Sequence, residues 1–71
     1  MIIEITTETI KLSQFLKKIG LIETGGRAKF FIVDHEIMIN GKPAVSRNQQ
    51  INNGDIIWID DEVYKIKTIA H

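Results

Sequence analysis

The chain has 71 residues, enough for one small domain with a thin core and too few for a deep substrate cavity. It is 44% hydrophobic and 25% charged, as soluble globular proteins are, and its apolar runs are far shorter than the roughly 18 residues of a membrane span. It has no cysteine, which excludes disulfides and thiolate metal sites. Together with an N-terminus unlike a signal peptide, this predicts a cytoplasmic protein.

The formal net charge is zero, which argues against a nucleic-acid partner unless the charges are separated along the chain. They are separated. From Lys11 to Arg47 there are seven basic and three acidic residues, or 7 − 3 = +4, whereas the first ten residues carry two acids, or −2. From Asn48 onward there are four acidic and two basic residues, which gives a net charge of −2 for this segment as well. The basic middle suffices for an RNA-binding face, because such a face requires local positive potential and not net charge.

The first half of the chain predicts a strand and then a helix. The β-branched and apolar residues of Ile2–Thr6 predict the strand. Residues Lys11–Ile19 predict the helix, which Gly20 ends. Its apolar side chains repeat at i, i+3, i+4 and i+7, and they are Leu12, Phe15, Leu16 and Ile19.

A second helix is predicted to begin near Thr24, whose hydroxyl can cap a free backbone N–H, and to stop near Asp34 or His35. Its apolar stripe consists of Ala28, Phe31 and Ile32. Phe30 lies off this stripe. An aromatic there can stack on an RNA base, but burial statistics favour a core position, which is the prediction.

The second half of the chain changes to a period of two, which is typical of strands and hairpin turns. We expect strands over Ile37–Ile39, Ala44–Val45, Ile56–Ile59 and Val63–Ile69. The turns between them are Asn40–Gly41, Asn52–Asp55 and Asp60–Asp61, and Ser46–Gln50 is expected to be irregular. The fold class is therefore α+β, with two helices packed on a small antiparallel β-sheet in a single domain over residues 1–71.

Four short motifs occur in a specific order and spacing, and they are residues 11–16 (KLSQFL), 24–29 (TGGRAK), 37–42 (IMINGK) and 53–57 (NGDII). In this the chain resembles the S-four RNA-binding domain, also called the alpha-L RNA-binding motif, over about residues 10–59. The short length and the residues GGRAK resemble its small stand-alone YaaA/YbcJ-like members. The resemblance implies a non-catalytic module that binds structured RNA, above all ribosomal RNA, in ribosome assembly or on the ribosome.

The resemblance also implies which positions face RNA. Lys11 matches the basic residue that opens the first helix, Thr24 opens the second helix, and Lys29 follows the small residue there. Asn40, Gly41 and Lys42 match the hairpin turn. The chain departs from the family at Ser13, Gly25 and His35, where an acid, an arginine and a glycine are common.

The candidate RNA-binding set combines these positions with the cations of the basic middle, because Lys and Arg displace counterions from phosphates. It consists of Lys11, Lys17, Lys18, Thr24, Gly25, Gly26, Arg27, Lys29, Asn40, Lys42 and Arg47. Among them Arg27, Lys29 and Arg47 rank first. Two successive glycines have two explanations: close approach of an RNA backbone to free N–H groups, or a loop that needs glycine for its turn.

Other functions have weaker support. The zero net charge keeps open a protein-interaction adaptor whose acidic C-terminal hairpin or exposed sheet edge binds a basic partner. No nucleophile–base pair or metal set is visible, so no enzyme activity and no cofactor are expected. His35 and His71 lack matching ligands, the acids at 60–62 are typical of a solvated turn, and Trp58 and Tyr64 are expected to be packing residues.

Overall fold

The computed structural model describes residues 1–69, so His71 lies outside the described residues. The main sheet has five strands, in the order β1 (Ile2–Ile5), β7 (Glu62–Thr68), β6 (Ile56–Ile59), β3 (Ile37–Ile39) and β4 (Lys42–Pro43). A separate two-stranded ribbon pairs β2 (Thr9–Lys11) with β5 (Gln50–Asn52). The helical segments are α1 (Leu12–Lys18), the 3₁₀ turn η1 (Gly25–Arg27) and α2 (Ala28–Asp34).

The α+β class is as predicted, but the sheet is mixed and not antiparallel. β1 runs parallel to β7, with Ile2 opposite Lys65 and Ile5 opposite Thr68, whereas the other pairs in the main sheet are antiparallel. A parallel pair needs a long crossover, and here nearly the whole chain lies between the two strands. The terminal amine of Met1 donates to the Val63 carbonyl at 3.1 Å and extends this pairing.

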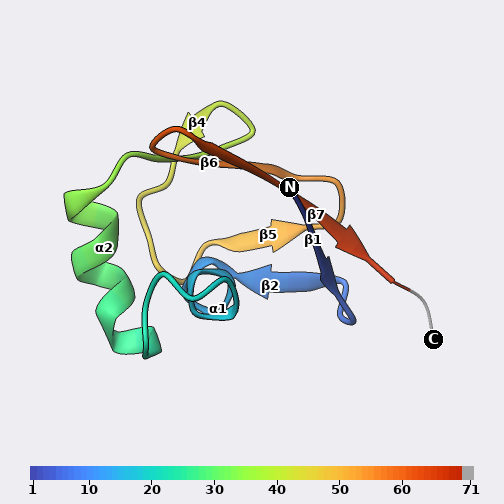
Figure 1. The fold of residues 1–71 in the computed structure, drawn as a ribbon, viewed down its shortest axis with the longest axis horizontal. Coiled ribbons are helices and arrows are strands. Elements are labelled where there is room, and N and C mark those ends of the chain that lie inside the picture. The colour runs from blue at the N-terminus through green and yellow to red at the C-terminus, as the bar shows by residue number, and fades with distance from the viewer. Residues whose placement is uncertain (70–71) are drawn as a thin grey trace.

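Helix α1 forms the centre of the core, as its apolar stripe predicts. Leu12, Phe15 and Leu16 are fully buried, and the Phe15 ring meets the ring of Tyr64 on β7 edge-on at 5.6 Å. In Figure 1, α1 is seen nearly end-on below the main sheet, beside the β2–β5 ribbon, and α2 stands at one end of the molecule. Gly20 adopts a positive φ of 82° just after the helix, as expected for a helix-ending glycine.

The second helical segment ends before His35, as predicted, but it begins differently. Thr24 is extended and precedes η1, yet its hydroxyl makes no capping hydrogen bond. The Arg27 N–H instead donates to the Thr24 carbonyl at 3.1 Å. Because the chain enters through a tight 3₁₀ turn, backbone groups satisfy each other and the predicted side-chain cap is absent.

The hairpin turns follow the sequence closely. Asn40 and Gly41 both have positive φ, 53° and 83°, which suits a two-residue turn between antiparallel strands. The return strand is β4 at Lys42–Pro43 and not the expected Ala44–Val45, because this two-residue turn starts the pairing immediately. Strand β5 occupies part of the stretch expected to be irregular, and β2 was not expected at all.

The outer face of the main sheet exposes an aromatic side chain that was expected to pack. Ile57 and Ile59 point into the core, so Trp58 between them points outward and is 49% exposed. Tyr64 is buried, as predicted. Within residues 1–69, no helix is both long and apolar enough to cross a membrane.

Candidate RNA-binding surface

The cations of the basic middle all lie at the protein surface, mostly on the helical side. Lys11 immediately precedes α1, and Lys17 and Lys18 form its last turn. Arg27 ends η1 and Lys29 lies in the first turn of α2. All seven side chains, including Lys42 and Arg47, are exposed. The local sequence accounts for this exposure on α1, because its apolar stripe faces the sheet and leaves the lysines on the opposite side.

Backbone hydrogen bonds attach a distant loop to the start of α1. The Leu12 N–H donates to the Gln49 carbonyl and the Ser13 N–H donates to the Arg47 carbonyl, each at 2.9 Å. These bonds satisfy N–H groups that have no partner within the helix. They also bring Arg47 beside the N-terminus of α1, where Lys11 lies, although Arg47 and Lys11 are 47 − 11 = 36 positions apart in the sequence.

These cations are not neutralised within the protein. Among residues 1–69, the one contact at ion-pair distance between acidic and basic side chains joins His35 to Asp60, and none of the nine Lys and Arg side chains takes part in one. An exposed cation that is not held in an ion pair can contact phosphate groups directly. The side chains of these cations can therefore form ion pairs with an anionic partner.

The two glycines that open the second helical segment lie at the surface. Both are exposed and neither has a positive φ. A Cβ added at Gly25 would meet no atom within 4 Å, and one at Gly26 would meet only the Thr24 hydroxyl oxygen at 4.0 Å. Neither the backbone conformation nor internal packing requires glycine here. The explanation that the turn needs glycine therefore has no support in this geometry, and close approach of an RNA backbone stays a prediction.

The side-chain amide of Asn40 forms hydrogen bonds within the protein. Its Oδ1 accepts from the Ile56 N–H and its Nδ2 donates to Asp55 Oδ1, each at 2.9 Å. These bonds attach the β3–β4 turn to β6. Lys42 pairs with Ile39, whose side chain is in the core, so Lys42 emerges from the sheet on the helical side at its β4 edge.

The expectation that Phe30 belongs to the core is wrong. The ring is 58% exposed, and the Lys29 ammonium lies 5.0 Å from its centroid. Only Ala28 is fully buried on α2, while Phe31 and Ile32 are partly buried against the core. An exposed aromatic ring next to a cation is a common arrangement on RNA-binding surfaces.

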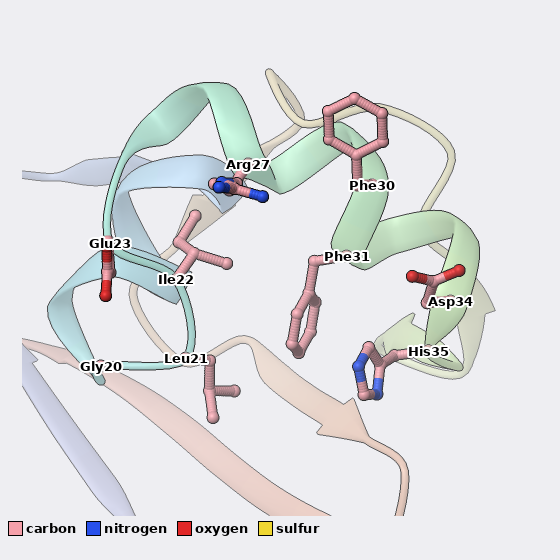
Figure 2. A pocket seen from close by; sticks show the side chains of 9 residues that line it. All are labelled: Gly20, Leu21, Ile22, Glu23, Arg27, Phe30, Phe31, Asp34 and His35. Carbon is pink, nitrogen blue, oxygen red and sulfur yellow. The ribbon is translucent and has the colours of Figure 1, made fainter.

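A hollow beside this ring includes two acids that sequence reasoning did not select. It has a volume of about 460 Å³ and lies between the 20–24 loop and α2 (Figure 2). Its lining consists of Gly20, Leu21, Ile22, Glu23, Arg27, Phe30, Phe31, Asp34 and His35. Glu23 and Asp34 are 34 − 23 = 11 residues apart, so only the return of the chain along α2 brings them to one rim.

His35 connects the end of α2 to the β6–β7 turn. Its ring stacks on Phe31 with centroids 4.0 Å apart, and its Nδ1 lies 2.7 Å from Asp60 Oδ2. Asp60 Oδ1 also accepts from the Glu36 N–H at 3.1 Å. The hydrogen bond with His35, and then that from Glu36, lower the pKa of Asp60 below its ordinary value of 3.8. No group of acids and histidines within residues 1–69 is arranged to hold a metal ion.

Comparison with known proteins identifies the family of the chain. The sequence model of the S4 domain matches residues 3–67. The chain belongs to the S4-domain family. It is also 41% identical over 58 residues to the probable ribosome maturation protein RlbA of Bacillus subtilis (strain 168), which covers 82% of each protein.

The S4-domain match confirms the resemblance found in the four sequence motifs and extends it. It begins inside β1 and ends inside β7, so it includes the parallel strand pair outside the motif core of residues 10–59. All seven cations of the basic middle lie within it. The basic middle is thus part of one S4 domain and not an appended charged segment.

Proposed function

We propose that this S4 domain is a non-catalytic RNA-binding module that recognises structured RNA, ribosomal RNA in particular, and acts in ribosome assembly or on the ribosome. The observation that carries the proposal is the group of exposed cations on the helical side, none of which is paired with an acid within residues 1–69. The similarity to a probable ribosome maturation protein supports the choice of ribosomal RNA.

The proposed contact residues are those of the candidate RNA-binding set, with different roles. Arg27, Lys29 and Arg47 would bind phosphates, and Arg can do so through two parallel hydrogen bonds. Lys11, Lys17, Lys18 and Lys42 would add attraction around them. Gly25 and Gly26, next to Thr24, would let the RNA backbone approach the chain closely. Asn40 would act by holding the turn that carries Lys42, because its amide is already bonded within the fold.

The proposal is tested with two variants, each of which replaces two basic residues by glutamate on a different side of the molecule. The double variant Arg27→Glu/Lys29→Glu alters exposed residues and should fold normally. Its matched control is Lys65→Glu/Lys67→Glu, which makes the same change in net charge on the outer face of β7, where Tyr64 and Ile66 point the other way. Filter binding to purified ribosomal subunits and their extracted RNA, over a series of salt concentrations, measures both.

We expect the helical-side variant to lose most of its affinity, and its plot of log affinity against log salt to become shallower by about 2. The control should bind nearly as the unmodified chain does. Equal losses in the two variants would mean that only net charge matters, and unchanged binding in the first variant would remove this surface from the proposal.

A protein-interaction adaptor is the second candidate, and a different surface favours it. The outer face of the main sheet carries a hollow of about 680 Å³ lined by Met38, Asn40, Gly41, Ile56 and Trp58. Apolar residues at outward positions of a sheet are unusual unless something covers them. A partner protein that stays bound after nuclease treatment, and is released by Trp58→Ala, would favour this role over RNA binding.

A further inference from the structure

The hollow beside α2 has an apolar floor and a polar rim. Figure 2 shows Ile22 and Phe31 pointing into the gap from its two sides, with Leu21 nearby, while Arg27 lies above it. Glu23 and Asp34 lie on opposite sides of the rim. At about 460 Å³ the hollow falls within the range of small-molecule sites and is ample for one planar base.

The wall formed by α2 is held in place before any ligand binds. The Phe31 ring is stacked on His35 at an interplanar angle of 18°, and Asp60 holds His35 through a 2.7 Å contact. Phe30 projects from the helix at the rim and is exposed, although aromatic side chains are usually buried. An aromatic ring at the rim and an apolar floor suit a flat aromatic ligand, because contact with them would remove apolar surface from water.

The two carboxylates distinguish this hollow from a phosphate site. Glu23 and Asp34 lie among the cations proposed to bind RNA, where they would repel phosphates. Within residues 1–69, neither forms an ion pair with Arg27 or Lys29, so their oxygen atoms are not bound to those cations. An ionised carboxylate only accepts hydrogen bonds, and the donors in RNA are the ribose 2′-hydroxyl and the amino and imino N–H groups of bases. A base that enters an apolar hollow presents the latter.

We propose that the hollow receives one unpaired RNA base that carries an amino group, with guanine preferred. Guanine places an imino N–H beside an amino group, and one carboxylate can accept from both. Such an edge is free only when the base is outside a double helix, so the RNA would be recognised at a bulge or loop. This inference rests on the proposed RNA-binding function and specifies where on the RNA the domain binds.

Titration of the isotope-labelled chain with single nucleotides, followed by two-dimensional NMR, tests the inference directly. Guanosine monophosphate should shift the backbone signals of residues 20–23 and 28–35 more than others, and should bind about fivefold or more tightly than uridine monophosphate, which lacks an amino group. Phe30→Ala should weaken binding, whereas Val33→Ala, a control on the same helix outside the hollow, should not. Asp34→Asn should reduce the preference for guanosine over uridine.

Shifts located elsewhere, equal affinity for the two nucleotides, or an unchanged preference in Asp34→Asn would overturn the inference. If any of these occurs while ribosomal RNA still binds and Arg27→Glu/Lys29→Glu still abolishes that binding, the base site is wrong and the proposed function stands. If ribosomal RNA does not bind at all, the proposed function fails and this inference fails with it.

Discussion

Helices α1 and α2 have the same length and similar apolar patterns, yet the protein uses them differently. In α1, Phe15 is 0% exposed and packs against the sheet. In α2, Phe30 is 58% exposed and Val33 is 83% exposed, and Ala28 alone is fully buried. The difference shows that α1 contributes mainly to the core, whereas α2 contributes mainly exposed side chains to the protein surface. Packing within the fold therefore does not explain the apolar side chains of Phe30 and Val33, whereas it does explain Ala28.

The largest expected effect comes from the same substitution in both helices. Phe15→Ala should lower the free energy of unfolding by about 3–5 kcal/mol, because it leaves a cavity in the core. Phe30→Ala should change it by no more than about 0.5 kcal/mol, because the ring is largely in solvent. Urea denaturation followed by circular dichroism measures both.

A small domain has little stability to lose, so a loss of cooperative unfolding in Phe15→Ala also agrees with the expectation. A cost for Phe30→Ala comparable to that for Phe15→Ala would contradict the division between the two helices.

The next effect concerns the turn that leads into α2. Gly26→Ala should raise the free energy of unfolding by about 0.4–1 kcal/mol, since the site has room for a methyl group and a backbone conformation that alanine adopts readily. The same variant should bind ribosomal RNA more weakly if RNA approaches this backbone. Urea denaturation and filter binding on one preparation test both expectations.

Gly54→Ala provides the contrast for Gly26→Ala. It also has open space around it, but its φ is +88°, so alanine there should destabilise the fold. A loss of stability in both variants would show that Gly26 serves the fold after all.

The smallest effect is at the connection between α2 and the β6–β7 turn. The pKa of Asp60 is lowered in the folded chain, so its ionised form contributes stability above its ordinary value of 3.8, and this contribution disappears as the pH falls through the lowered pKa. Asp60→Asn should therefore have a slightly lower Tm than the unmodified chain at neutral pH. The two values should converge in acid, below about that ordinary value.

Thermal melts of both proteins over a pH series measure this difference. A Tm difference that does not change with pH would mean that the charge of Asp60 contributes nothing, and that its hydrogen bonds with His35 and Glu36 act through geometry alone.

The sequence by itself determined the two helical segments, the longer strands and the family. The spacing of Leu12, Phe15 and Leu16 predicted α1, Asn40–Gly41 predicted the first hairpin turn, and four ordered motifs predicted the S4 domain. These features depend on residues close together in the chain, so periodicity and turn chemistry are enough to read them. The seven cations of the basic middle were also identified from sequence, because charge is visible without a structure.

Only the tertiary structure decided which elements meet. The parallel pairing of β1 with β7 joins the two ends of the chain, and the β2–β5 ribbon joins short segments that carry little apolar pattern. The exposure of Phe30 and Trp58, and the placement of Glu23 and Asp34 around one hollow, likewise depend on tertiary packing. The physical reason is that a sequence pattern shows which side chains are apolar or charged, whereas burial and proximity depend on the packing of residues far apart in the chain.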